Sequence, residues 1–448
     1  GKIEVNGHSG NTQANPSLGF YGEAGSFTNE ADSGSISSSG NYAHAVALVG
    51  NTTTGINFHN KGKIETTGKG NIGVYADGKY TFSHEGNSAK INVGTNALGI
   101  FAKNTNGTLN INAPIVLSDS GTGTNAGTTI GIYSDGEAKV NFGQNSKITI
   151  GKGAVGLYSS DATKFSNTFK VVSGKSLEIV LGQNSTFGLL NGATGTVNVG
   201  TYLKNNTLNI STFGSGASIF YTTGGVTANL NENHTVTNGT AASTAVLVGA
   251  NGSTVKIDTG KTLTTNTNVG LIATKAGGAN GATAQNDGNI VSTRDSGIGI
   301  YTTESKGNST GTITMQNKES VGILGENNST LTNSGKIELQ KDKSAGIYGK
   351  DSDVTNSGAG TKGIYVKDEK SAGIYGLLTS TASADKTLSN TGLVKVENTG
   401  KSGSAGIYAK LGTTAAKKLS TVNSGTIEVA QIGSAGIYAE NTSAQANT

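Results

Sequence analysis

The 448-residue sequence contains 69 Gly, two Pro, no Cys and no Trp, and charged residues make up only 14% of it, with a net charge of +4. A hydrophobic content of 33% is too low for several thick globular cores, and the low charge does not match a disordered segment. The missing cysteines exclude a disulfide framework and thiolate metal sites, and the scattered lysines form no basic patch of the kind that nucleic acids need.

The predicted elements are short apolar segments that recur along the whole chain. A strand-like Lys-Ile-Glu-Val at residues 2–5 is followed by Leu-Gly-Phe-Tyr at 18–21, a box of apolar, small, apolar and aromatic residues. Between the box glycines Gly19 and Gly436 the mean spacing is about 28 residues, which lies in the range of solenoid repeats. Strict and looser copies give sixteen boxes, at 18–21, 46–49, 72–75, 98–101, 130–133, 155–158, 187–190, 217–220, 245–248, 269–272, 298–301, 321–324, 345–348, 372–375, 405–408 and 435–438.

A second motif, Asn-Ser-Gly-x-Ile-x-Leu/Val, lies between the boxes and is clearest at 333–339 and 423–429. Its apolar residues alternate with polar ones, which is the strand period, and Asn, Gly, Ser and Asp separate the runs. Most variation in repeat length falls on one side of the repeat. Each repeat is therefore expected to hold two or three short strands and no helix.

Such a repeat has too little apolar surface to fold alone and must stack on its neighbours. The sequence predicts an all-β, right-handed parallel β-helix of about 16 coils of 23–33 residues, as one continuous rod over residues 1–448 without a signal peptide or an outer-membrane barrel. Leucine-rich repeats, calcium-binding nonapeptides and propeller blades fit the motifs or spacing less well.

Stacking places identical residues of successive coils above one another as ladders. By alternation, Ile337, Leu339, Ala345 and Ile347 are expected to point inward, and Asn333 is expected to join an amide ladder at the turn. The box glycines and tyrosines should share the outer face.

Catalytic and metal-binding constellations have little support in the sequence. The five histidines read as isolated surface or turn residues, and the carboxylates at 351 and 353 and at 368 and 369 read as solvated corners. Arg294 beside Asp295 reads as an exposed ion pair. We therefore expect no enzyme activity, no cofactor and no bound metal. No apolar run approaches the ~18 residues of a spanning helix, so this segment is not expected to lie in a membrane.

Two features are candidate binding sites. Successive coils should align box tyrosines that either form a structural ladder or offer a surface to a sugar or protein: Tyr348, Tyr375, Tyr408 and Tyr438. The loops at 273–284, 376–386 and 409–418 leave one corner after the box, and that at 118–128 projects elsewhere. Lys386, Lys417 and Lys418, at the ends of two of these loops, complete the candidate set.

The succession of Asn-Ser-Gly-x-Ile-x-Leu and Ser-Ala-Gly-Ile-Tyr-Gly, clearest over 285–448, resembles the passenger repeats of large autotransporter adhesins, particularly the fusobacterial outer-membrane kind. The resemblance implies a passenger that is displayed at the cell surface through an outer-membrane barrel not present in this chain. It implies attachment to host cells or other bacteria through a glycan or protein receptor. We expect a monomeric rod.

Two other hypotheses remain open. A non-binding spacer stalk that projects a distal adhesive tip would need the ladders but no ligand site. A β-helical polysaccharide-degrading enzyme would need acidic or basic residues clustered on one sheet.

Overall fold

The computed structural model describes residues 1–7, 10–51, 53–103, 106–122, 127–135, 138–202, 207–277, 280–397, 400–412 and 416–441, with the backbone alone of Leu203. The chain forms two compact units, Gly1–Tyr221 and Thr222–Thr448, and each is described by itself. The predicted single rod over 1–448 stays a prediction.

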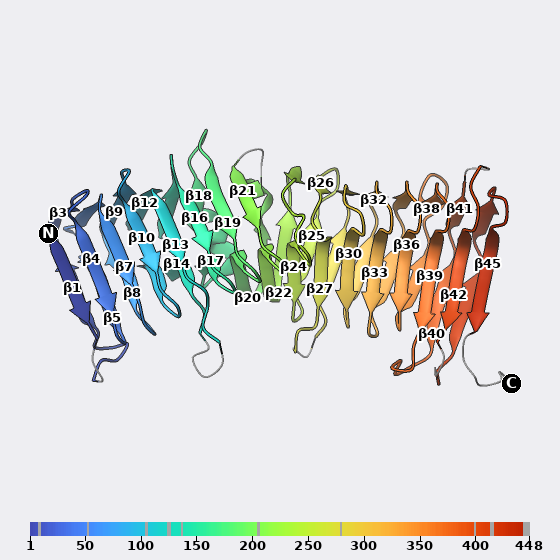
Figure 1. The fold of residues 1–448 in the computed structure, drawn as a ribbon, viewed down its shortest axis with the longest axis horizontal. Helices are drawn as coiled ribbons and strands as arrows, with labels where there is room; N and C mark the ends of the chain where they lie inside the picture. Colours follow the sequence, from blue (N-terminus) through green and yellow to red (C-terminus); the bar gives the residue numbers. More distant parts are fainter. Residues whose placement is uncertain are drawn as a thin grey trace. The chain divides into compact units, whose positions relative to one another are not determined.

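Unit 1 is built from short parallel strands that repeat on three faces (Figure 1). The first face is an eight-stranded sheet of β1 (Lys2–Asn6), β4 (Ser35–Ser39), β7 (Lys63–Thr66), β10 (Lys90–Val93), β13 (Pro114–Leu117), β16 (Lys147–Ile150), β19 (Leu177–Leu181) and β21 (Leu208–Phe213). The box face holds β2 (Ser17–Gly22), β5 (Ala43–Gly50), β8 (Ile72–Gly78), β11 (Leu98–Lys103), β14 (Ile130–Asp135), β17 (Val155–Ser159) and β20 (Thr186–Asn198). The third is a six-stranded sheet of β3 (Gly25–Asn29), β6 (Ile56–Asn60), β9 (Tyr80–Glu85), β12 (Gly107–Asn112), β15 (Lys139–Phe142) and β18 (Phe169–Val171).

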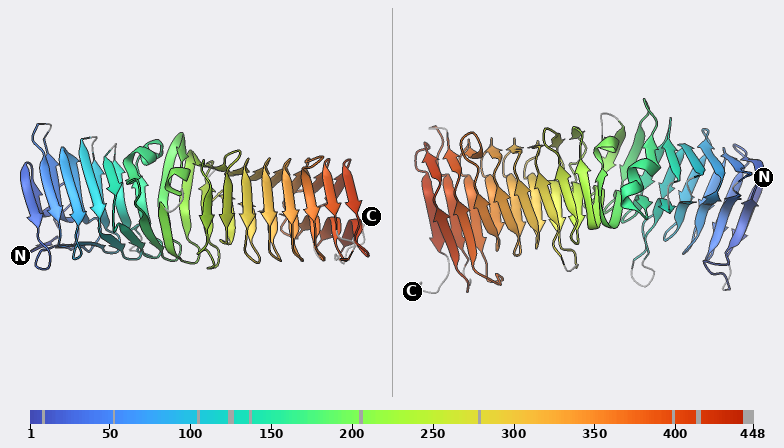
Figure 2. Two further views of the ribbon diagram at one scale, coloured as in Figure 1. Left: turned by 90° about the horizontal axis from the view of Figure 1, so that it is seen from above. Right: turned by 180° about the vertical axis from the view of Figure 1, so that it is seen from behind.

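Unit 2 repeats the same plan (Figure 2), and β22 (Ser218–Leu230) contains the boundary between the units. Its box face holds β24 (Ala245–Ala250), β27 (Val269–Thr274), β30 (Ile298–Thr303), β33 (Val321–Glu326), β36 (Ala345–Lys350), β39 (Ala372–Leu378), β42 (Ala405–Leu411) and β45 (Ala435–Asn441). The next face holds β25 (Thr254–Ile257), β28 (Thr283–Asn286), β31 (Lys306–Ser309), β34 (Thr330–Asn333), β37 (Asp353–Asn356), β40 (Lys386–Asn390) and β43 (Leu419–Asn423). The eight-stranded third face holds β23 (His234–Val236), β26 (Thr262–Thr265), β29 (Asn289–Ser292), β32 (Thr312–Met315), β35 (Lys336–Leu339), β38 (Gly363–Val366), β41 (Leu393–Val396) and β44 (Thr426–Val429).

Each unit is a parallel β-solenoid, which confirms the predicted all-β fold class. A strand pairs with the strand of the same face in the next coil, as β33 does with β36 and β36 with β39. The register advances by 23 residues from Ile298 to Val321 and by 33 from Ala372 to Ala405, which are the limits of the predicted coil length. Insertions are absorbed mostly between strands, so the ladders stay in register, although the pairing of β19 with β21 shifts by one residue between Ile179 and Val180.

The core of each coil is one layer of aliphatic side chains. Ile337, Leu339 and Ile347 are fully buried, as predicted. Because their partners in the next coils are also Ile or Val, each core position becomes a continuous aliphatic ladder. A thin core of this kind explains how a chain with 33% hydrophobic residues folds.

A buried amide ladder runs along one corner of unit 2, as predicted for Asn333. Asn333 Nδ2 donates to Asn356 Oδ1 at 2.9 Å, Asn356 donates to Asn390 at 2.8 Å, and Asn390 donates to Asn423 at 2.7 Å. Each buried amide group thus finds its partner in the next coil. The first residue of the Asn-Ser-Gly motif is therefore a structural residue.

Two box assignments and the orientation of the box itself were wrong in detail. The register aligns residues 44–47 and 186–189 with the other boxes, in place of 46–49 and 187–190. A Cβ on Gly346 would lie 2.5 Å from Ile364 Cγ2 and 2.6 Å from the Gly373 carbonyl oxygen, so this glycine faces the core and the next coil. Strict alternation is broken at the glycine, and Ala345 lies against the outer surface beside Tyr348.

Unit 1 contains short helical turns that the sequence did not predict: the 3-10 turn η2 (Ala162–Lys164), α1 (Phe165–Thr168) and α2 (Gly200–Leu203). Phe165 and Phe169 pack together there with ring centroids 4.8 Å apart. The Tyr202 hydroxyl donates to the carbonyl oxygens of both. The turns thus surround a buried aromatic cluster of Phe165, Phe169 and Tyr202.

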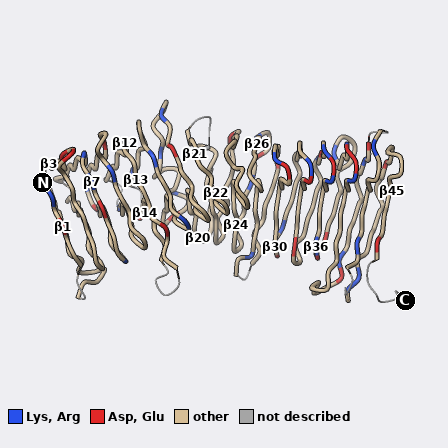
Figure 3. Tube along the Cα trace, in the orientation of Figure 1, with Lys and Arg blue, Asp and Glu red and all other residues tan. Residues whose placement is uncertain are grey.

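Positive and negative residues lie close together along the third face of unit 2, where Figure 3 shows blue and red segments beside each other. Glu338 Oε1 and Oε2 lie 2.7 Å from Lys367 Nζ and 2.6 Å from Lys336 Nζ. Burial alone would raise the pKa of Glu338, but hydrogen bonds from Lys336, Lys367 and Gln340 outweigh burial and lower it to about 2. The lysines of this face are neutralised by neighbouring carboxylates.

Candidate functional site

The four predicted tyrosines form one stripe on the box face of unit 2. Parallel pairing places Tyr348, Tyr375, Tyr408 and Tyr438 in register on β36, β39, β42 and β45. Successive ring centroids are 4.6, 4.9 and 5.2 Å apart, and the middle pair is inclined by only 15°. Tyr375 and Tyr408 therefore turn their ring faces toward each other, whereas the two outer pairs are inclined by 33° and 50° and expose more of their ring faces.

A groove of about 680 Å³ runs beside this stripe. The box alanines line it: Ala345, Ala372, Ala405 and Ala435. The two preceding coils have larger residues, Ile298 and Val321, at the position that pairs with these alanines. The small alanine methyl groups leave room that Ile or Val side chains would fill, so the Ala of Ser-Ala-Gly-Ile-Tyr deepens the groove.

The box serines form a hydrogen-bond ladder under one side of the groove. The backbone N–H of Ser344 donates to Ser371 Oγ at 3.0 Å, that of Ser371 donates to Ser404 Oγ at 3.2 Å, and that of Ser404 donates to Ser434 Oγ at 3.0 Å. Each serine thereby satisfies a backbone donor of the preceding coil. The serine of the motif thus has a structural explanation that sequence alone did not supply.

Two lysines stand at the rim of the groove. Lys343 and Lys370 immediately precede their box serines and have positive φ angles of 54° and 55°. Lys343 Nζ lies 3.5 Å from Glu319 and Lys370 Nζ lies 3.6 Å from Glu369. These exposed ion pairs are weak, so both ammonium groups can exchange their carboxylate partners for a ligand at little cost.

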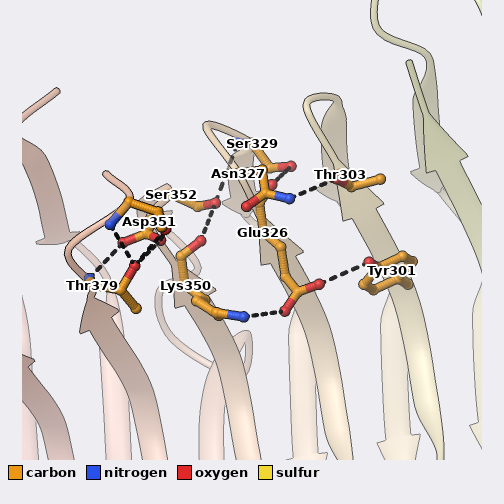
Figure 4. A network of polar contacts seen from close by, with 10 residues as sticks. Tyr301, Thr303, Glu326, Asn327, Ser329, Lys350, Asp351, Ser352 and Thr379 are labelled. Atoms are coloured by element: carbon orange, nitrogen blue, oxygen red, sulfur yellow. Dashed lines mark hydrogen bonds and ion pairs between the residues drawn. The ribbon is translucent and has the colours of Figure 1, made fainter. Parts of the chain in front are cut away.

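Tyrosine hydroxyl groups of the box face join a polar network with residues of the next coils (Figure 4). Tyr301 Oη donates to Glu326 Oε2 at 2.8 Å, and Lys350 Nζ lies 3.2 Å from Glu326 Oε1. Tyr408 and Lys410 contact Glu440 in the same way. Burial raises the pKa of Tyr301 and of Tyr348 to about 12, with help from Glu326. The phenols therefore stay protonated and act as donors near neutral pH.

The three candidate lysines do not share the tyrosine surface. Lys386 begins β40 on the neighbouring face, where it is only 5% exposed and its Nζ lies 3.6 Å from Asp353. Its backbone N–H donates to the Lys418 carbonyl at 2.9 Å. Lys417 and Lys418 are exposed at the end of the 409–418 loop, of which residues 413–415 lie outside the described structure. Parts of the loops at 118–128 and 273–284 also lie outside it.

The loop at 376–386 is anchored by a buried carboxylate. Asp351, only 2% exposed, accepts hydrogen bonds from Thr379 N at 2.7 Å and Thr379 Oγ1 at 2.6 Å (Figure 4). The prediction of a solvated corner was therefore wrong for Asp351, because a loop inserted 28 residues later covers it. The loop is held to the preceding coil by its own hydrogen bonds.

Other charged residues also have structural partners. Asp368 lies 2.9 Å from Lys401 Nζ. Arg294, expected to pair with Asp295, donates from Nη1 to the carbonyl oxygens of Gly239 at 2.7 Å and Ala241 at 3.0 Å. The Asp368–Lys401 pair joins neighbouring coils, and Arg294 reaches across the adjacent coil to one earlier in the chain.

Two histidines are buried, contrary to the surface placement expected. His84 is fully buried in unit 1, where Asn60 Nδ2 donates to its Nδ1 at 2.9 Å and its Nε2 donates to the Pro114 carbonyl at 3.1 Å. It extends the ladder begun by Asn29 and Asn60. His44 is 5% exposed on the box face.

Within the described ranges, no three His, Asp or Glu side chains gather in a manner suited to a metal ion. In that same part of the chain, no helix has the length and apolarity needed to cross a membrane.

Comparison with known proteins gives only weak similarity to solved structures. Neither protein-family profiles nor curated proteins match this sequence. Among solved structures, one that is similar is a mutant of the tailspike protein of E. coli bacteriophage HK620 in complex with a hexasaccharide. It has 9% sequence identity and a TM-score of 0.23. Another mutant of that tailspike has 10% identity and a TM-score of 0.24. Each comparison covers 89% of this chain and 71% of the tailspike chain.

Proposed function

We propose that this chain is a segment of the β-helical passenger of a large autotransporter adhesin, displayed at the cell surface, and that it attaches to host cells or other bacteria through a glycan or protein receptor. The repeat motifs support this proposal, because the Asn-Ser-Gly and Ser-Ala-Gly-Ile-Tyr segments resemble those of such passengers. The solenoid fold is the one that the resemblance implies.

The observation that carries the binding role is the groove beside the tyrosine stripe. A spacer stalk needs the Ser, Gly and Ile of the motif, which serve hydrogen bonding, close packing and the core. It does not need a small Ala at a position that accepts Ile or Val in other coils. A groove open along several coils gives an elongated receptor a continuous contact surface.

The spacer stalk remains the second candidate, and one observation favours it. The tyrosine rings stack on one another, so most of their faces are used within the protein. If stacking is their whole purpose, the groove is a by-product of the ladder and binds nothing.

The test fills the groove without disturbing the ladders. In Ala372→Ile/Ala405→Ile, both new side chains reproduce the native Ile298, which occupies the same position in an earlier coil. Binding of the labelled chain to epithelial cells, to partner bacteria and to glycan and protein arrays is measured for the wild type and this variant. We expect binding to fall at least tenfold, or about 1.4 kcal/mol.

Ala359→Ile is the matched control, because it adds the same side chain at an exposed position outside the groove. It should bind like the wild type. Equal binding by the groove variant would place the receptor site on another surface, such as the loops at 376–386 and 409–418. A wild-type chain that binds no cell, glycan or protein would reject adhesion and leave the spacer stalk.

A further inference from the structure

A second groove, of about 600 Å³, lies on the box face of unit 1. An aromatic stack borders it: ring centroids are 5.4 Å apart between Tyr75 and Phe101 and 5.1 Å apart between Phe101 and Tyr133, with inclinations of 11° and 13°. The imidazole ring of His44 extends the stack: its centroid lies 6.3 Å from that of the Tyr75 ring, and the two ring planes are inclined by 10°. The stack therefore ends in a polar ring.

His44 is unusual for its position. Its paired residues in the neighbouring coils are Leu18 and Ile72, and the next three coils hold Leu98, Ile130 and Val155 at this box position, before Thr186 takes it in β20. It is only 5% exposed, and its Nδ1 has no hydrogen-bond partner among the residues that the structure describes. A buried polar atom without a partner destabilises the fold, so packing does not explain why histidine stands here.

The imidazole is suited to accept a hydrogen bond from an uncharged ligand. Burial lowers the pKa of His44, although the Ala43 backbone partly offsets this effect, so the ring is neutral near pH 7 and one nitrogen is an acceptor. A half-turn of the ring about its Cβ–Cγ bond exchanges Nδ1 with Cδ2. Either edge can thus be presented to the groove that the ring lines.

The remaining lining is mixed, with amide, phenol, ammonium and carboxylate groups from Gln13, Tyr42, Lys103 and Asp135. Lys103 Nζ lies 3.3 Å from Asp77, so its charge is already compensated. Hydrogen-bond donors and acceptors of both charges beside apolar ring edges match a chain of hydroxyl groups better than they match an anion or an apolar segment.

The spacing of the stack points to the kind of chain. The groove presents one aromatic edge per coil at intervals of 5.4 and 5.1 Å. An extended peptide advances by about 3.3 Å per residue and soon falls out of step with that interval. A pyranose of an unbranched, equatorially (1→4)-linked glycan advances by about one coil height, so one sugar can face each coil. Alternate sugars, which share the same orientation, can make equivalent contacts.

We infer that the unit 1 groove binds an unbranched oligosaccharide of uncharged pyranoses, with the His44 imidazole accepting a hydrogen bond from a sugar hydroxyl. This site is separate from the groove of unit 2. The inference deepens the proposed adhesive function and rests on it for its biological purpose, but the binding site is defined by its own residues.

The experiment uses the full chain and a panel of neutral linear tri- to hexasaccharides of hexoses and N-acetylhexosamines, with binding followed by ligand-detected NMR. The variant His44→Leu copies Leu18 and Leu98 at the same box position. We expect it to unfold at a higher temperature than the wild type, because it removes an unpaired buried polar atom, and to bind the best oligosaccharide at least tenfold more weakly. In the wild type, that oligosaccharide should shift the imidazole ¹⁵N signals of His44, which the variant identifies by their loss.

Ala372→Ile/Ala405→Ile in unit 2 is the companion variant and should bind these oligosaccharides like the wild type. Unchanged binding by His44→Leu, an unmoved His44 signal, or binding lost only in the unit 2 variant would overturn the inference while leaving the proposed adhesion intact. A panel in which no neutral oligosaccharide binds would also overturn it, even if cells or protein receptors are bound. These outcomes differ from the one that would reject the proposed adhesive function, in which the wild-type chain binds no cell, glycan or protein.

Discussion

At the scale of single residues, each position of Ser-Ala-Gly-Ile-Tyr has a separate physical role. In the coil of β39, Ser371 accepts a hydrogen bond from the preceding coil, Ala372 lines the groove and Ile374 fills the core. Tyr375 stacks in the stripe. Gly373 permits the close approach of the next coil, since an added Cβ would lie 2.4 Å from Val394 Cγ1 and 2.7 Å from the Gly406 carbonyl oxygen.

Gly373→Ala is therefore expected to destabilise unit 2. The new methyl group cannot be accommodated without moving a core side chain and the backbone of a neighbouring coil, and such overpacking typically costs about 1–3 kcal/mol. Urea unfolding followed by circular dichroism measures the loss. Gly436→Ala is the control, because within the described ranges an added Cβ there meets only Ile427 Cγ2, at 3.8 Å. Equal losses in both variants would show that close approach is not the reason for the glycine.

At the scale of elements, polar ladders connect equivalent strands and fix their register. Unit 2 uses asparagines at the end of β34, β37 and β40, whereas unit 1 places His84 of β9 after Asn29 and Asn60. In these ladders, the imidazole of His84 and the amide groups of the asparagines all form hydrogen bonds with buried polar groups. Only the histidine can also take up a proton at neutral or mildly acidic pH. Burial lowers the pKa of His84 to about 4 from 6.5.

This difference predicts an acid sensitivity of unit 1. The unfolded chain binds a proton at His84 below pH 6.5, whereas the folded chain resists protonation until about pH 4. The stability contributed by neutral His84 is thus present above pH 6.5 and lost as the pH falls toward 4, by at most about 3 kcal/mol.

His84→Asn should remove this loss, because an amide can continue the ladder without titrating. Free energies of unfolding at pH 7, 5.5 and 4.5 for the wild type and the variant give the comparison. His59→Asn, at a half-exposed position of β6 outside this ladder, is the matched control. If His84→Asn and His59→Asn lose the same free energy of unfolding between pH 7 and pH 4.5, His84 is not the cause of the acid sensitivity.

At the scale of the whole molecule, contacts run mainly between successive coils within each unit. β36 pairs with β33 and β39, and β39 pairs with β36 and β42. A solenoid of this kind transmits disturbance to nearest neighbours and little further. Binding surfaces on different coils are thereby free to vary without loss of the fold.

Hydrogen–deuterium exchange of Gly373→Ala tests this locality. Amides of β36, β39 and β42 should exchange faster than in the wild type, while those of β24 and β27, several coils away in the same unit, should keep their protection. A uniform rise in exchange across unit 2 would mean that the whole unit unfolds as one cooperative block.

The sequence by itself determined the repeat, the strand period, the coil length, the aliphatic ladders at Ile337 and Ile347 and the amide ladder at Asn333. These features follow from local alternation and from the requirement that a thin repeat stack on its copies. Only the tertiary structure decided that Ala345 lines a groove, that His44 is buried with no partner for Nδ1 among the described residues, and that Lys386 lies apart from the tyrosines. The reason is that the surroundings of each side chain come from coils 23 or more residues away and from the break in alternation at the box glycine, neither of which a local pattern contains.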